Sequence, residues 1–136
     1  MLIFTQSRAG FLQFAAVCLL VLAWPLAAQA ADPGKEVTTA ADHAGYAAGA
    51  DTVAKVHLHL HHVVNCLVGP DGDDFDAKSG NPCDGQGNGA INDADSEGQA
   101  DLKDALALAK TGIGMESLGA AQNVATTVQQ LLAKSE

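Results

Sequence analysis

The hydrophobic positions of this chain recur at steps of three and four in four separate segments, which is the period of an amphipathic helix. No stretch alternates between apolar and polar residues clearly enough to predict a β-strand. The clearest helical segment begins at Asp51, a good N-cap, and ends at the stop signal Gly69-Pro70. Its apolar face consists of Val53, Val56, Leu60, Val63, Val64 and Leu67.

One predicted helix precedes this segment and two follow it. The four helices are expected to begin and end as follows: Thr38 or Thr39 to about Ala48, Asp51 to Gly69, Ser96 to about Lys110, and Ser117 to about Ser135. The connection at 49–51 is so short that the first two helices must be antiparallel neighbours. The sequence therefore predicts an all-α fold, a small up-and-down four-helix bundle built from two helical hairpins.

The segment 69–95 that joins the two hairpins differs in kind from the rest of the chain. It is rich in Gly, Asp, Asn and Pro, and its only large apolar residues are Phe75 and Ile91. No hydrophobic period survives in it, so it is predicted to be a long loop. Loops of this length in compact domains are usually functional, or disordered unless something ties them down.

The N-terminus has the features of a signal peptide. Arg8 supplies a positive charge, residues 11–26 form an apolar run, and Ala28-Gln29-Ala30 has the small-x-small form of a cleavage site. We expect residues 1–30 to be removed, which leaves a single helical domain at 31–136 in the periplasm or secreted, without a stable membrane anchor. A retained membrane anchor is the alternative, although the run is barely long enough to span a bilayer.

Two cysteines remain after this cleavage, Cys66 and Cys83, because Cys18 lies in the signal peptide. An even number of cysteines in an exported chain predicts a disulfide. Such a bridge would tie the middle of the long loop to the end of the second helix, and loop-closure entropy makes it worth about 3 kcal/mol. The alternative is a free Cys66 thiolate that joins His59 or His62 as a soft metal ligand.

Charge and motif content limit the possible functions. The chain has a net charge of −9, and loss of Arg8 with the signal peptide makes it −10. Nucleic acid and anionic membrane surfaces are poor partners for such a chain, whereas cations are good ones. We find no Ser–His–acid arrangement and no C-x-x-C-H haem motif, so the sequence predicts a protein that is not an enzyme.

Four of the five histidines lie within the second predicted helix. His57 and His61 share one flank a turn apart and are predicted to form the centre of a metal site, with His43 of the preceding helix as the third ligand. His59 on the other flank and His62, which points more nearly away, are further candidates. Imidazole favours copper(II), zinc or nickel, with copper first in affinity, and binding should weaken as the pH falls through about 6.5. The alternative is a set of solvent-facing histidines beside carboxylates.

A second metal motif lies at 84–95. This stretch resembles the twelve-residue calcium loop of EF-hand and dockerin-type proteins, with Asp84, Gln86, Asn88 and Asp95 at ligand positions and Gly89 at the turn. It departs from the pattern because Gln86 replaces the usual Asp or Asn and Asp95 replaces the bidentate Glu. The resemblance implies weak calcium binding. The alternative is a glycine-rich turn with acidic side chains in solvent.

The Ala40-x-x-His43-Ala44 helix, the paired hairpins and the secretion signal resemble the family of periplasmic small metal-binding proteins, which are helical bundles that carry histidines. The resemblance implies an exported protein that sequesters or carries a divalent transition metal. That family spreads its histidines along most helices, whereas here the last two helices have none. The segments around Cys66 and Cys83 are also similar to uncharacterised exported bacterial proteins. The alternative function is a secreted interaction module that uses the disulfide-pinned loop 71–95.

Overall fold

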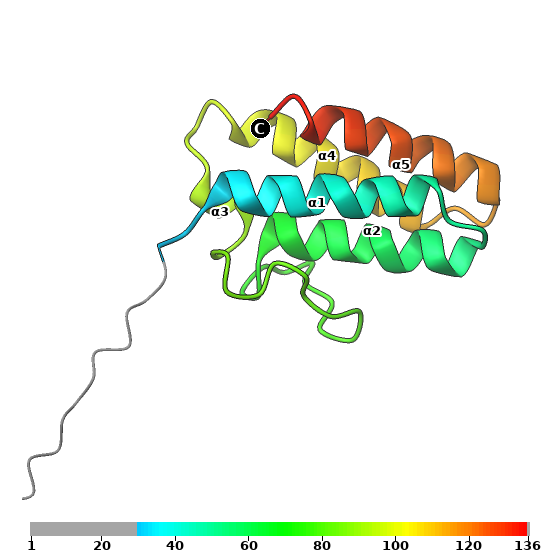
Figure 1. The fold of residues 1–136 in the computed structure, drawn as a ribbon, viewed down its shortest axis with the longest axis horizontal. Helices are drawn as coiled ribbons and strands as arrows, with labels where there is room; N and C mark the ends of the chain where they lie inside the picture. Colours follow the sequence, from blue (N-terminus) through cyan, green and yellow to red (C-terminus); the bar gives the residue numbers. More distant parts are fainter. Residues whose placement is uncertain (1–29, 136) are drawn as a thin grey trace, which may run out of the picture.

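A computed structural model of the chain describes residues 30–135, so the predicted signal peptide lies outside the described residues except for Ala30. Within this range the fold is entirely helical (Figure 1), which confirms the predicted all-α class. The helices are α1 (Pro33–Ala48), α2 (Val53–Val68), α3 (Ala90–Asp93), α4 (Gln99–Ile113) and α5 (Leu118–Leu132). None of the helices in residues 30–135 is both long and apolar enough to cross a membrane.

The first helix begins earlier than predicted, because Asp32-Pro33 is a stronger start signal than Thr38 or Thr39. The Asp32 carboxylate accepts the backbone N–H of Lys35 at 3.0 Å, and Pro33 occupies the first turn, where its missing N–H costs nothing. The helix therefore gains more than one turn at its N-terminus. These additional residues place Glu36 in the protein interior.

The start of α4 is also different from the prediction. Ser96 does not cap this helix. Instead, one carboxylate oxygen of Asp95 accepts the backbone N–H groups of Glu97, at 3.1 Å, and Gly98, at 3.0 Å. The helix then runs from Gln99 to Ile113, beyond the expected end at Lys110.

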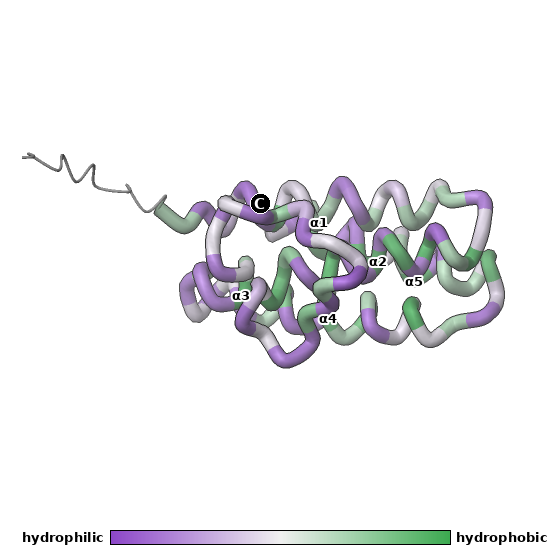
Figure 2. The backbone as a smooth tube through the Cα atoms, turned by 90° about the horizontal axis from the view of Figure 1, so that it is seen from below, coloured by the Kyte–Doolittle hydropathy of each residue, from purple (hydrophilic) through white to green (hydrophobic). Residues whose placement is uncertain are grey.

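The four long helices form two antiparallel hairpins packed side by side, with α1 against α2 and α5, and α4 against α5 and α2. Hydrophobic and hydrophilic residues alternate along each of them (Figure 2), as amphipathic helices require. After Glu36 and Val37 the core face of α1 consists of alanines, which lets its neighbours approach closely. A similar close approach occurs between α2 and α4, where a Cβ added to Gly112 would lie 2.6 Å from a methyl group of Leu60.

The long loop folds back against α2 and contains the short helix α3, which the sequence did not predict (Figure 1). Cys66 and Cys83 form the predicted disulfide. This pairing is incompatible with the alternative in which a free Cys66 thiolate binds a metal. Ile91 packs against the core, whereas Phe75 is half-buried and outside the core cluster.

Among the described residues, Glu36 is the one charged residue that is buried, and only 1% of it is exposed. One carboxyl oxygen accepts the backbone N–H of Gly89 at 2.9 Å, and the other has no hydrogen-bond partner. Burial raises the pKa of Glu36 to about 7, with smaller contributions of the same sign from Asp93 and Asp32, while the Gly89 hydrogen bond opposes them. Glu36 thus ties the start of α1 to the end of the long loop through the Gly89 N–H.

Candidate metal centre

Three histidine side chains converge where α1 crosses the middle of α2. The Nδ1 atom of His43 lies 3.2 Å from Nδ1 of His59 and 3.1 Å from Nδ1 of His62. One ligand nitrogen from each of the three lies within 4.8 Å of both others. For metal–nitrogen bonds of about 2.05 Å, two ligands are about 3.3 Å apart at a tetrahedral angle and about 2.9 Å apart at a right angle. The observed separations fall between these two values.

Local helix geometry explains why these three residues meet. His59 and His62 are three residues apart on α2, so their side chains leave the helix on neighbouring parts of one surface. The turn at Gly49–Ala50 brings α1 back alongside α2, and its small core residues let the two backbones approach closely. His43 of α1 is thereby placed against both imidazoles of α2.

The tautomer of His62 is determined by the long loop. Its Nε2 lies 2.6 Å from the backbone carbonyl oxygen of Ser79, which can only accept a hydrogen bond. Nε2 must therefore carry a proton, and in the neutral ring Nδ1 presents its lone pair toward His43. Metal-binding histidines generally have such a partner on the second ring nitrogen.

Protons cannot satisfy this cluster completely. A proton on Nδ1 of His43 can be donated to Nδ1 of His62, but the same nitrogen also lies 3.2 Å from Nδ1 of His59. One hydrogen atom would then have to serve two acceptors, and any further protonation would bring positive charges together. A cation bound to all three lone pairs removes this conflict. The three histidines could thus hold a metal ion.

The surroundings of His43 and His59 favour their neutral form, which is the form that binds metals. The pKa of His43 is lowered to about 4, mainly by burial and to a smaller extent by the neighbouring His62 and His59, against an opposing effect of Asp42. Burial also lowers the pKa of His59, and His62 adds to this. His43 and His59 consequently stay neutral at a lower pH than an isolated histidine does, with a ring nitrogen lone pair available to a metal.

Tyr46 covers the outer side of the cluster. Its ring centroid lies 5.4 Å from that of His43 and 5.5 Å from that of His59, and the residue is 57% exposed. All three histidines are half-buried. The site is thus held by the bundle on one side and reached from solvent on the other.

The structure groups the histidines differently from the sequence prediction. His57 and His61, the predicted centre, belong to no group of three potential ligands among residues 30–135. The His57 Nε2 atom lies 2.8 Å from the carbonyl oxygen of Met115, in the turn between α4 and α5. His61 Nδ1 lies 3.6 Å from a carboxylate oxygen of Asp76. His43 meets His59 and His62 instead, two residues that the prediction named only as further candidates.

The predicted calcium ligands are directed to other contacts. Gln86 accepts the hydroxyl of Thr39 at 3.0 Å, and the Asn88 side chain donates to Asp93 at 3.2 Å. Asp95 holds the start of α4, as described above. Asp84 is exposed and belongs to no ligand group in the described part of the chain. The segment 84–95 thus contains α3, and three of these four side chains are engaged in other contacts.

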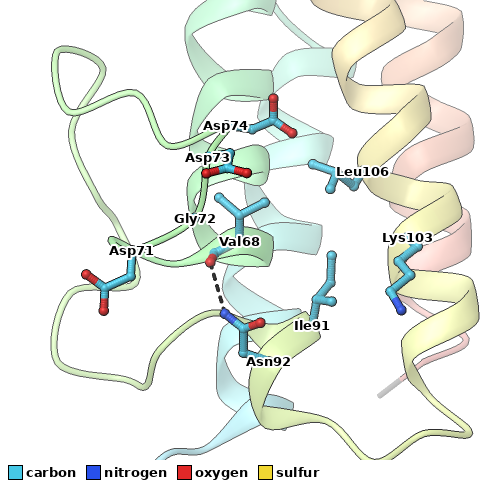
Figure 3. A pocket seen from close by; sticks show the side chains of 9 residues that line it. All are labelled: Val68, Asp71, Gly72, Asp73, Asp74, Ile91, Asn92, Lys103 and Leu106. Carbon is cyan, nitrogen blue, oxygen red and sulfur yellow. Dashed lines mark hydrogen bonds between the residues drawn. The ribbon is translucent and has the colours of Figure 1, made fainter.

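A hollow of about 360 Å³ lies between the long loop and α4, away from the histidine cluster (Figure 3). Val68, Ile91 and Leu106 supply an apolar lining, and Lys103 stands on the α4 side. Three carboxylates of the loop line the other side, namely Asp71, Asp73 and Asp74. Asp74 is already paired with Lys110, which donates to it at 2.6 Å. The hollow combines apolar and acidic groups but does not collect ligands for a metal ion.

Comparisons with protein-family models, curated proteins and solved structures found no match for this chain. The function of the chain must therefore be inferred from the geometry of the site. Two residues that contribute to that geometry, Asn65 and Ser79, were not singled out in the sequence. Asn65 could have been noticed, because an amide side chain interrupts the apolar surface of α2 and must find partners there.

Proposed function

We propose that this protein is an exported metal-binding protein that sequesters or carries a divalent transition metal through His43, His59 and His62. The observation that carries the proposal is the convergence of the three Nδ1 atoms, with separations of 3.1 and 3.2 Å that match those of ligands on one ion. The disulfide and the acidic net charge of −9 support a role outside the cytoplasm and an affinity for cations.

Three imidazoles leave at least one coordination position for water or for a ligand from another molecule. No cysteine or carboxylate belongs to the ligand group found in residues 30–135, so the donor set favours borderline ions such as copper(II), zinc and nickel. Copper(II) ranks first in the general affinity order. An ion bound at a half-exposed site can be exchanged with a partner, as a carrier or a buffer requires.

The direct test is titration of the exported protein with copper(II) against a competing chromophoric chelator. The parent should bind one equivalent, and His43→Ala should weaken binding by at least about 100-fold, because removing a ligand costs more than removing a partner of a ligand. His61→Ala is the matched control, since it removes an imidazole outside the cluster. A parent that binds no copper, zinc or nickel at micromolar concentration would disprove the proposed function.

A second candidate function is a secreted interaction module that uses the loop 71–95. The observation that favours it is the hollow of Figure 3, where an apolar lining and loop carboxylates are suited to a ligand with both apolar and basic groups. This candidate predicts that replacing the three histidines together leaves the function intact. It would take first place if the metal titration gave no binding.

A further inference from the structure

One contact of the histidine cluster comes from outside α1 and α2, namely the backbone carbonyl of Ser79 in the long loop. A backbone carbonyl on a loop can orient an imidazole only if the loop itself is fixed. The structure contains an arrangement that fixes this part of the loop. It begins with Asn65, which lies one turn after His62 on α2.

Asn65 is fully buried, at 0% exposure, and all its hydrogen bonds go to the loop. Its Nδ2 group donates to the carbonyl oxygens of Asp76, at 2.8 Å, and Gly80, at 2.7 Å. Its Oδ1 atom accepts the backbone N–H of Asp76 at 2.8 Å. The amide therefore uses both donors and its acceptor to hold the two ends of the segment 76–80.

Ser79 lies inside the segment that Asn65 clamps. The segment is closed further by the Ser79 N–H, which donates to the Asp76 carbonyl at 3.2 Å, and by the Ser79 hydroxyl, which donates to the Asp76 carboxylate at 2.7 Å. Gly80, with φ of 87°, adopts a left-handed conformation that a residue with a Cβ rarely takes. These contacts fix the peptide between Ser79 and Gly80, whose carbonyl accepts the proton of His62.

The disulfide secures the same part of the loop covalently. Cys66 is adjacent to Asn65 on α2, and its partner Cys83 follows Gly80 by three residues. The loop therefore cannot move far from the face of α2 that carries His62. Asn65 sets the position of the turn within this limit, because hydrogen bonds specify a geometry that a covalent tether alone does not.

We infer that Asn65 is a positioning residue for metal binding, which acts through the Ser79 carbonyl to hold His62 with Nδ1 directed at the metal. The inference rests on the proposed function and adds the residue that prepares one of its ligands. Partners of this kind fix the tautomer and the ring orientation of a ligand, and their loss generally lowers metal affinity 10- to 100-fold.

The first test uses two glycines of the same loop. Gly80→Ala disturbs the peptide that carries the Ser79 carbonyl, whereas Gly85→Ala places a methyl group at a similar left-handed conformation, with φ of 73°, away from His62. Both positions are exposed, so both variants should retain the helical bundle. We expect copper(II) affinity to fall about 10- to 100-fold in Gly80→Ala and to stay within about twofold of the parent in Gly85→Ala.

The second test reads the tautomer directly in the metal-free protein. Long-range proton–nitrogen NMR spectra should show His62 as the Nε2–H form in the parent, and a mixture of forms in Gly80→Ala and in Asn65→Leu. Ser79→Ala is a further control, because it keeps the backbone carbonyl and should keep the tautomer. A merely structural role for Asn65 would lower stability without changing the tautomer.

Three outcomes are decisive. An Nδ1–H form of His62 in the parent would overturn the inference, and so would equal copper affinities of the parent and Gly80→Ala. A parent that binds no metal would disprove the proposed function itself. The tautomer would then show whether the Asn65 hydrogen bonds still orient His62 through the Ser79 carbonyl. Failure of the inference can thus be told apart from failure of the site.

Discussion

The two flanks of α2 carry the same residue type and have different roles. On one flank, His59 and His62 face His43 of α1 and form a cluster of ring nitrogens. On the other, His57 contacts the Met115 carbonyl and His61 lies near Asp76, so each has a separate structural partner. The comparison shows that spacing along a helix identifies histidines able to act together, but the neighbouring helix decides which of them do.

The largest expected difference between the flanks is in copper affinity. The double variant His59→Ala, His62→Ala should bind copper(II) about 10⁴-fold more weakly than the parent, because the loss of each ligand lowers the affinity by at least about 100-fold. The double variant His57→Ala, His61→Ala should change affinity by less than about threefold, since it removes no member of the cluster. The measurement is chelator competition with both variants under the same conditions. The reverse order of effects would show that the ion binds on the His57 flank.

Removing His43 should change how the metal-free protein responds to acid. Because the pKa of His43 is lowered to about 4 in the fold, the unfolded chain binds its proton first as the pH falls. The stability that neutral His43 contributes is therefore fully present above about pH 6.5. It is lost as the pH falls toward 4, and the loss is at most about 3 kcal/mol. Denaturant unfolding of the parent and of His43→Ala at pH 4, 5, 6 and 7 should show that the parent loses stability relative to the variant as the pH falls. A constant difference would contradict the lowered pKa.

Glu36 on the same helix has the opposite pH dependence and would mask the histidine effect. Its pKa is raised to about 7, so the fold keeps its proton more tightly than the unfolded chain does. The stability that protonated Glu36 contributes is fully present below about pH 4.5. It is lost as the pH rises through 7, and the loss is up to about 3 kcal/mol. Glu36→Gln, which imitates the protonated form, should be more stable than the parent at pH 8 and nearly equal at pH 4. Equal stabilities at both pH values would show that this carboxyl is not perturbed.

The smallest expected effect concerns the flank of α2 that carries His57 and His61. His57→Ala removes the contact with the turn between α4 and α5, so the free energy of unfolding should fall by about 1 kcal/mol, with no change in copper affinity. Leu58→Ala, at an exposed neighbouring position, is the control for general effects of shortening this helix. If His57→Ala weakened copper binding without destabilising the protein, the two flanks would not be separable in the way the structure indicates.

The residues of the candidate site were all visible in the sequence, but their grouping was not. His43, His59 and His62 were named as candidate ligands because they are histidines on adjacent antiparallel helices. The prediction chose His57 and His61 because their spacing of one turn suits a metal ion, and helical periodicity by itself could not exclude this choice. Asn65 and Ser79 were missed because their roles depend on a loop that has no periodic signal.

The sequence by itself determined the periodic elements and the disulfide. Apolar spacing located α2 and α5, and the even number of cysteines beyond residue 30 predicted the disulfide that the structure contains. Tertiary packing decided which flank of α2 meets α1. A short turn makes two helices antiparallel but permits the second to lie on either side of the first. The side was settled by the other hairpin, because α4 packs against α2 and the turn after α4 contacts His57, which leaves the His59 and His62 side for α1.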